Sequence, residues 1–173
     1  MRRLLLVGAV VVLSGCASAP AEKELLSASA PLKDKEGKDV GAATLIQTSD
    51  GLRIAITGYR LPPGPHGLHI HAVGQCQPPD FASAGAHFNP DGKQHGQLNP
   101  AGPHAGDLPN LVVAPSGEGG IDITTKAVTL EPGPTSLLGG SGKSIVIHAG
   151  PDDGKTDPAG NSGARIACGV IEK

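Results

Sequence analysis

Seven side chains in this sequence have types and spacings that suit a site for two metal ions. Six are histidines and one is an aspartate: His69, His71, His87, His95, His104, His148 and Asp107. Imidazole is the commonest metal ligand in proteins, and it suits both copper and zinc. Two four-coordinate ions need eight donor positions between them. Seven residues are therefore enough only if one histidine binds both ions, one through each ring nitrogen.

The spacings divide these residues into two sets. His69 and His71 lie two apart in the segment GLHIH, so on a strand both rings project from one face. His148, in the apolar segment SIVIHA, can add an imidazole from a neighbouring strand, although a lone strand histidine is more often an ordinary core or surface residue. Together with His87 these rings form a four-nitrogen set, which suits Cu(II). Three imidazoles and a carboxylate with no vacant position are typical of a structural zinc site, and the second set has this composition: His87, His95, His104 and Asp107.

Short strands must position these side chains. The chain is long enough for one domain with a real core, and its 26 glycines and 16 prolines punctuate alternating apolar segments at short intervals. Asp50-Gly51 is a hairpin signal between two such segments. No helical periodicity competes with this pattern. We therefore expect an all-β fold, an eight-stranded antiparallel sandwich or flattened barrel, with strands at 27–33, 41–48, 52–59, 67–72, 111–114, 121–128, 144–149 and 164–171.

Two long segments without apolar runs separate these strands, at residues 74–109 and 150–163. A structureless loop of such length normally argues against a compact domain. Here the first of them contains His87, His95, His104 and Asp107, so a bound ion could order what a core cannot. We expect both segments to be functional loops.

The first residues read as an export signal. Arg2 and Arg3 precede an apolar run of ten residues, Leu4 to Leu13, which is too short to span a bilayer. The segment then ends in Leu-Ser-Gly-Cys, which resembles a bacterial lipobox and implies a lipid on Cys16; an ordinary signal peptide with a chance cysteine is the alternative. We therefore expect a signal peptide at 1–15, a lipidated cysteine and flexible tether at 16–26, and a domain at 27–173. The protein would be exported and lipid-anchored to a membrane in the periplasm or cell envelope.

The remaining cysteines and the charge balance narrow the possibilities further. Cys76 and Cys168 are an even pair, most simply a disulfide in an exported chain, the alternative being two unpaired buried thiols. Without its signal the chain has 12 basic and 16 acidic residues and no basic block. This composition argues against a nucleic-acid partner.

The motifs together resemble a family. GLHIH, GAHFNP, the His95–His104–Asp107 spacing, HAGPDD and GNSGARIACGVI are similar to those of the bacterial exported Cu/Zn superoxide dismutases, over residues 27–173. The resemblance implies a Greek-key order for the eight strands of the sandwich or flattened barrel. It implies copper bound by His69, His71, His87 and His148. It also implies zinc bound by His87, His95, His104 and Asp107, with His87 shared as an imidazolate. Cys76 and Cys168 match the family's disulfide.

Three more positions acquire roles from this resemblance. Asp152 matches a carboxylate that links a copper ligand to a zinc ligand, where it would otherwise be a solvated turn residue. Arg165 matches an arginine that attracts the anionic substrate beside copper, where it would otherwise be an ordinary surface arginine. His66 has no ligand position left and is expected to hydrogen-bond the backbone around the site.

The function that the resemblance implies is dismutation of superoxide to oxygen and hydrogen peroxide, with Arg165 and His87 as the catalytic residues. Such an enzyme would protect the cell envelope from superoxide formed outside the cytoplasm. A metal-buffering module on the same fold and a structural sandwich with incidental histidines are the alternatives. The subunit contacts of bacterial members differ from those of the animal dimer, so the chain is expected to be a monomer or a homodimer.

Overall fold

The computed structural model describes residues 25–173. The predicted signal peptide and Cys16 lie outside this range. Within residues 25–173, no helix is both long and apolar enough to cross a membrane.

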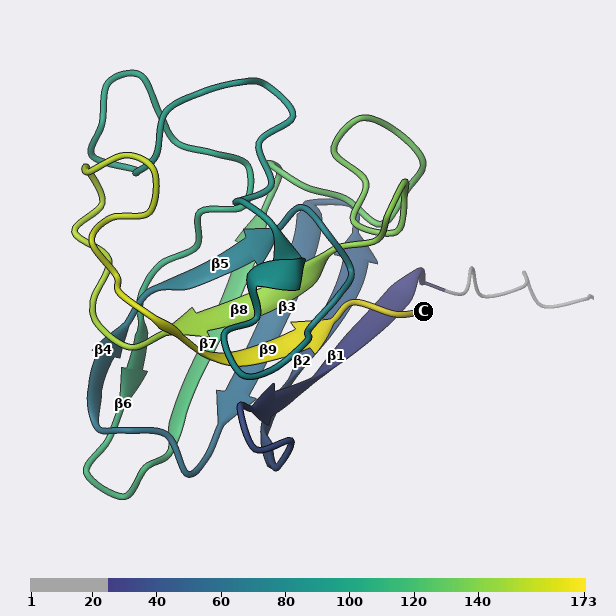
Figure 1. The fold of residues 1–173 in the computed structure, drawn as a ribbon. Coiled ribbons are helices and arrows are strands. Elements are labelled where there is room, and N and C mark those ends of the chain that lie inside the picture. The colour runs from purple at the N-terminus through teal and green to yellow at the C-terminus, as the bar shows by residue number, and fades with distance from the viewer. Residues whose placement is uncertain (1–24) are drawn as a thin grey trace, which may run out of the picture.

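Nine antiparallel strands form one strongly curved sheet (Figure 1). Their order across the sheet is β4-β6-β7-β3-β2-β1-β9-β8-β5. One short 3₁₀ helix, η1 (Ala82–Ala84), accompanies the strands in the described range. The strands are β1 (Ser27–Asp34), β2 (Asp39–Thr48), β3 (Gly51–Gly58), β4 (Gly64–His66), β5 (Leu68–His71), β6 (Leu111–Val113), β7 (Gly119–Thr125), β8 (Ser144–His148) and β9 (Arg165–Val170).

The two ends of this sheet are joined through a single residue. β4 and β5 are the terminal strands of the order, yet only Gly67 separates them in the chain. The amide of Gly67 donates to Gly150 O at 2.8 Å, and the amide of His148 donates to Gly67 O at 2.8 Å. The sheet is thus a nearly closed barrel. This confirms the predicted all-β antiparallel fold class.

The strand count differs from the sequence-based expectation, which was eight. The ninth strand is β4, which lies in a proline-rich segment outside all the expected strands. Pro65 pairs with Val112 of β6 on one side, and β4 is a terminal strand of the hydrogen-bonded order. Proline is tolerated at such an edge because its missing N–H is not needed there. The prolines therefore limit β4 to an edge position without excluding a strand.

The β2–β3 hairpin shows how the sequence pattern builds the core. Thr48 pairs with Gly51 across the Ser49–Asp50 turn, as the hairpin signal predicted. Along β3, Leu52, Ile54 and Ile56 are buried, whereas Arg53 and Thr57 are exposed. This alternation puts one face of the sheet into the barrel and leaves the other in solvent.

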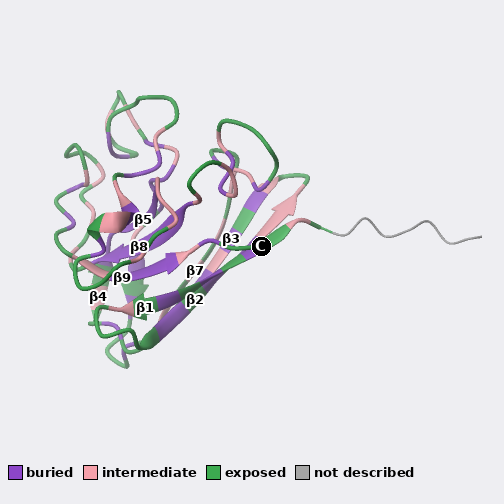
Figure 2. Cartoon of the chain, turned by 45° about the vertical axis from the view of Figure 1, so that its right-hand side comes forward, coloured by how far each residue is buried: buried purple, intermediate pink, exposed green. Residues whose placement is uncertain are grey.

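The strands β5 and β8 are buried on both faces. In their antiparallel pairing Leu68 opposes Ile147 and Ile70 opposes Ile145, and these four residues belong to the main core. His69 and His71 alternate with them and point to the outer face of the barrel. Figure 2 shows that loop segments cover this face, so that buried residues continue from these strands into the loops.

Three long loops complete the domain. Residues 72–110 and 149–164 correspond to the two predicted functional loops. A third, between β7 and β8, is longer than the expected strands imply, because the strand expected to reach Val128 ends at Thr125. Val128, Leu130 and Leu137 from this loop are buried in the main core. Their apolar side chains anchor the loop without a strand.

The predicted disulfide is confirmed. Cys76 and Cys168 are bonded across a sequence separation of 92 residues, with their Cα atoms 5.6 Å apart. The bond ties the first loop to β9. Phe81, Ala84 and Val146 pack with Cys168 in a small second cluster beside it.

Candidate metal centre

The first loop is attached to β5 at both of its outward histidines. His69 forms an isolated antiparallel bridge with Asp107, and His71 forms one with His87. The amide of Phe88 donates to Ile70 O at 2.8 Å, which continues this pairing. These backbone contacts place candidate ligands of the loop next to candidate ligands of the strand, although up to 38 residues of sequence (His69 to Asp107) separate them.

The predicted four-nitrogen set is assembled. Ligand atoms of His69, His71, His87 and His148 all lie within 4.8 Å of one another, and all four residues are buried. Each ring keeps one nitrogen without a hydrogen-bond partner in the described part of the chain. These atoms are His69 Nδ1, His71 Nε2, His87 Nε2 and His148 Nε2.

The other nitrogens of these rings fix the tautomers. His71 Nδ1–H donates to Gly85 O at 2.9 Å, and His148 Nδ1–H donates to Gly163 O at 3.0 Å. A neutral imidazole has only one N–H, so the Nε2 of each ring is left with a free lone pair. A lone pair held in place in this way is what a metal ligand requires.

Burial keeps these rings neutral. It lowers the pKa of His71 to about 2, and it lowers the pKa of His87 and of His148 to about 4. Desolvation is the largest cause in each case, because a charged ring loses more by leaving water than a neutral ring does. Near neutral pH these three rings are therefore unprotonated and available to a cation without first losing a proton.

The second predicted set converges on one carboxylate oxygen. Asp107 Oδ1 lies 2.9 Å from His87 Nδ1, 3.1 Å from His95 Nδ1 and 3.3 Å from His104 Nδ1. For tetrahedral zinc with bonds of about 2.0 Å, neighbouring ligand atoms should be roughly 3.3 Å apart. Asp107 Oδ2 instead accepts from the amides of Gly96 (2.9 Å) and His104 (3.0 Å). These amide bonds orient the carboxylate so that Oδ1 faces the three rings. Burial opposes ionisation of Asp107, but the contact with His87 and the hydrogen bond from the Gly96 amide outweigh it and lower the pKa to about 2.

Asp152 joins the two sets. Its Oδ2 accepts from His69 Nε2 at 2.8 Å, and its Oδ1 accepts from His95 Nε2 at 3.0 Å. These two histidines help to hold the pKa of the Asp152 carboxyl below its usual range, against the opposing effect of burial. Asp152 thus joins His69, a candidate ligand of the first set, to His95, a candidate ligand of the second.

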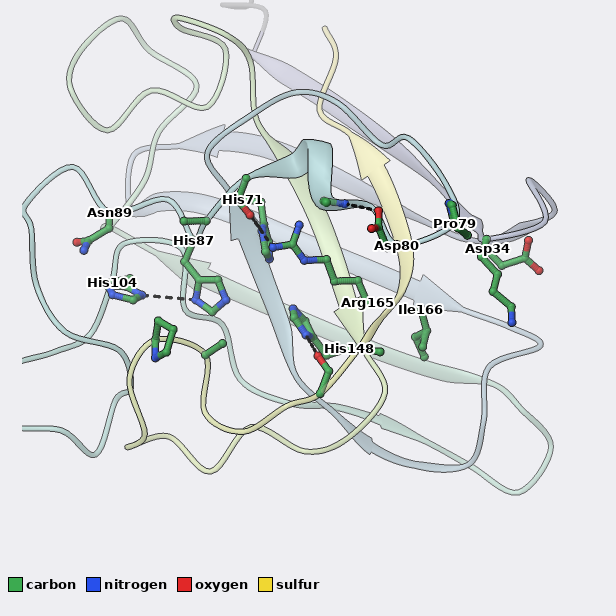
Figure 3. A pocket seen from close by; sticks show the side chains of 18 of the residues that line it. Asp34, His71, Pro79, Asp80, His87, Asn89, His104, His148, Arg165 and Ile166 are labelled. Atoms are coloured by element: carbon green, nitrogen blue, oxygen red, sulfur yellow. Dashed lines mark hydrogen bonds between the residues drawn. The ribbon is translucent and has the colours of Figure 1, made fainter.

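Arg165 is fixed beside the four-nitrogen set. Its two terminal nitrogens donate to Phe81 O at 2.6 Å and to Gly85 O at 2.7 Å. Gly85 O also accepts from His71, so one carbonyl oxygen orients both a candidate ligand and the guanidinium. Arg165, His71, His87 and His148 line a cavity of about 1300 Å³ (Figure 3). An anion entering this cavity meets a positive charge and free imidazole nitrogens together.

His66 lies where the resemblance predicted, against the backbone. It is buried, and its Nδ1 and Nε2 lie 2.8 Å from His148 O and 2.7 Å from Pro62 O. Asn110 was missed by the sequence analysis. Its side chain bonds both the amide and the carbonyl of Asp152, each at 2.9 Å. No local pattern could reveal a contact between residues 42 positions apart.

The donor set fits copper and zinc. Buried polar atoms in folded proteins normally have partners, and leaving one unpaired costs about 1–3 kcal/mol. Four unpaired imidazole nitrogens that face one point are therefore explained best by a cation that binds them. Nitrogen donors alone suit Cu(II), and three nitrogens with a carboxylate oxygen suit structural Zn²⁺.

The barrel and its two histidine-rich sets together define a metalloenzyme scaffold, and the comparisons identify the family. Residues 40–171 match the family described as copper/zinc superoxide dismutase (SODC). A Cu-Zn superoxide dismutase of Aquifex aeolicus is 50% identical over 148 residues, which are 84% of this chain and 86% of that protein. One from Deinococcus radiodurans is 41% identical over an alignment of 187 positions, which covers 99% of this chain and 98% of that protein. The chain therefore belongs to the copper/zinc superoxide dismutase family, whose enzymes use copper and zinc.

Solved structures agree with this assignment. A double mutant of a superoxide dismutase-like protein from Bacillus subtilis matches with a TM-score of 0.81 at 43% identity, over 84% of this chain and 97% of that chain. The Cu/Zn superoxide dismutase from Brucella abortus matches with a TM-score of 0.69 at 28% identity, over 85% of this chain and 100% of that chain.

Proposed function

We propose that this protein dismutates superoxide to oxygen and hydrogen peroxide outside the cytoplasm. His69, His71, His87 and His148 would hold copper. Zinc would be held by His87, His95, His104 and Asp107, so that His87 serves both ions. One observation carries this proposal: among residues 25–173, four imidazole nitrogens without hydrogen-bond partners lie together beside Arg165. One of them belongs to His87, whose other nitrogen faces Asp107.

The residues of the chain divide the work. Copper, when bound, supplies the exchange of single electrons with superoxide. Arg165 attracts the anion into the cavity through its positive charge. Two backbone carbonyls hold the half-buried guanidinium in place. Its position beside His71 and His148 brings the anion to the nitrogen set.

His87 is the residue best placed to handle a proton. Its Nδ1 faces Asp107, whereas its Nε2 has no partner among the described residues and its ring lines the cavity. Whenever copper does not occupy Nε2, that nitrogen could take up a proton from solvent and donate it to the peroxide product, which needs protons. The Asp107 side of the ring keeps the orientation of His87 constant during this transfer.

Metal analysis with an activity assay tests the proposal. The purified full-length protein should contain one copper and one zinc per chain. Dismutation should be lost on chelation and should return when copper is added back. A fully copper-loaded sample without dismutation would instead favour a metal-buffering protein on this fold. A sample without stoichiometric metal would favour a structural barrel, and either result would contradict the proposal.

The location of the protein is part of the proposal. A lipid on Cys16 would anchor the chain to a membrane of the cell envelope, where the enzyme would remove superoxide formed outside the cytoplasm. The disulfide in the folded domain supports an oxidising compartment. Metabolic labelling with a fatty-acid analogue should mark the wild-type chain and not Cys16→Ser. Equal labelling of both, or recovery of the unlabelled wild-type chain in the soluble cytoplasmic fraction, would contradict this location.

A further inference from the structure

The Cα atom of Gly160 packs against the Asp152 carboxylate and the ring of His95. A Cβ atom at this position would overlap Asp152 Oδ1 and would lie 2.5 Å from Asp152 Cγ and 2.8 Å from His95 Nε2. Real Cβ atoms do not approach other heavy atoms this closely. A methyl group at residue 160 therefore requires the carboxylate, the ring of His95, or both to move.

Hydrogen bonds restrain both oxygens of the Asp152 side chain. One oxygen accepts from His69, and the other accepts from His95 and from the amide of Gly154 at 2.6 Å. Its backbone is held on both sides by Asn110. Any rotation that made room for a methyl group would break at least one of the bonds to the two histidines.

Gly160 itself is also fixed. Its amide donates to Thr156 O at 2.7 Å, and its carbonyl accepts from the amide of Asp153 at 2.9 Å. These two bonds close the segment 153–160 on itself, so the backbone of residue 160 cannot withdraw from Asp152 without opening this turn.

The left-handed backbone alone does not account for a glycine here. Gly160 has φ +62°, but the next residue, Asn161, has φ +54° and is not glycine. Asparagine adopts this conformation at modest cost. What distinguishes residue 160 from its neighbour is the close approach to Asp152 and His95.

We propose that Gly160 is a positioning residue for the metal centre: its backbone forms the wall that keeps the Asp152 carboxylate between His69 and His95. The proposal deepens the proposed function, because it concerns the carboxylate that connects the two candidate metal sets. A methyl group at residue 160 would remove the acceptor of His69 Nε2, of His95 Nε2 or of both. The ligand nitrogen of each affected ring would then lose its fixed direction.

The test compares Gly160→Ala with Gly140→Ala. Gly140 is a matched control, since it has φ +65° and a Cβ there would meet no atom within 4 Å. Zinc affinity is measured by competition with a chromophoric chelator, and Co²⁺ spectra report the geometry of the zinc set. Loss of an outer partner of a ligand typically weakens metal binding 10–100-fold. We expect that loss and a changed Co²⁺ spectrum in Gly160→Ala only. Equal zinc affinities and spectra in the two variants would overturn the proposal.

A double variant tests whether the effect passes through Asp152. Asp152→Ala removes the two atoms that the new methyl group would approach most closely, Oδ1 and Cγ, and leaves the 2.8 Å contact with the freed ring of His95. In that background Gly160→Ala should weaken zinc binding less than about 3-fold, since most of the loss has already occurred. A further 10–100-fold loss would show that Gly160 acts independently of Asp152 and would refute the proposal.

Asp152→Ala and the double variant also test the proposal if Gly160→Ala fails to fold. If Gly160→Ala alone is unfolded, Asp152→Ala/Gly160→Ala should fold as well as Asp152→Ala, measured by circular dichroism and thermal unfolding. An unfolded double variant would overturn the proposal. None of these readouts depends on dismutation. A wild-type protein that binds zinc without activity would contradict the proposed function, but the proposal about Gly160 would still be tested by zinc affinity and folding.

Discussion

His87 Nδ1 lies 2.9 Å from Asp107 Oδ1, while Nε2 of the same ring has no hydrogen-bond partner in residues 25–173. One ring therefore faces a carboxylate-containing set with one nitrogen and an all-nitrogen set with the other. His104 Nδ1, 3.4 Å from His87 Nδ1, belongs to the first set. The two candidate metal sites are adjacent because they share this ring, and removing a ligand that belongs to only one set should leave the other set in place.

Asp107→Asn should abolish stoichiometric zinc binding while copper still binds. The side chain of Asn is uncharged, so the three rings would face either a neutral amide oxygen or an NH₂ group in place of the carboxylate oxygen. Asp107 is not a member of the other set, whose four ligand nitrogens all belong to histidines. Copper and zinc per chain, measured by elemental analysis, check this outcome. Asp91→Asn, an exposed aspartate in the same loop, is the control and should keep both metals. Retention of zinc by Asp107→Asn would contradict the assignment.

Arg165→Glu should lower the rate of dismutation at least about tenfold without loss of copper. Reversing the charge beside the free nitrogens replaces attraction of the anion by repulsion, and steering of this kind changes rates by about 10–10³. The rate of the wild type should fall as salt is added, and that of the variant should fall less or rise. Arg60→Glu makes the same charge change on an arginine that packs over Tyr59. If both variants slow the reaction equally, Arg165 has no special role.

The metal-free protein should lose stability as the pH falls from about 6.5 to about 4. Burial lowers the pKa of His87 and of His148 to about 4, and lowers that of His71 further, whereas unfolded histidines titrate near 6.5. The unfolded chain therefore binds more protons in this interval, and the free energy of unfolding decreases with falling pH. The unfolding temperature at pH 5 should be lower than at pH 7.5 by about 5 °C or more. An unchanged or higher value at pH 5 would show that these rings are not buried and neutral.

Removing the disulfide should reduce both stability and activity. The bond closes a loop defined by a sequence separation of 92 residues, for which the chain-entropy model gives about 4–5 kcal/mol. Cys76 also anchors the loop whose Phe81 and Gly85 carbonyls hold Arg165. Cys76→Ser, Cys168→Ser and the double variant should lose the same free energy of unfolding in denaturant titrations, because each removes one and the same bond. Additive losses in the double variant would argue that the cysteines act separately.

The strand pattern could be predicted from sequence because alternation is local. Leu52, Ile54 and Ile56 face the core, and the Asp50-Gly51 signal marks a real hairpin. The spacing of His69 and His71 puts both on one face of β5 for the same reason. β4 and the full extent of the anchored loop between β7 and β8 were not predicted. The first depends on an edge position, and the second on apolar residues that reach the core from irregular backbone.

Residue types and short spacings alone predicted the seven candidate ligands, the need for a shared histidine and the all-β antiparallel class, because all three follow from local chemistry and periodicity. Only the tertiary structure decided which nitrogen of each ring is free, how Asn110 and Gly160 hold Asp152, and which carbonyls fix Arg165. These relationships join residues tens of positions apart, often through backbone atoms that every residue type shares. They arise when the barrel closes and brings its loops together.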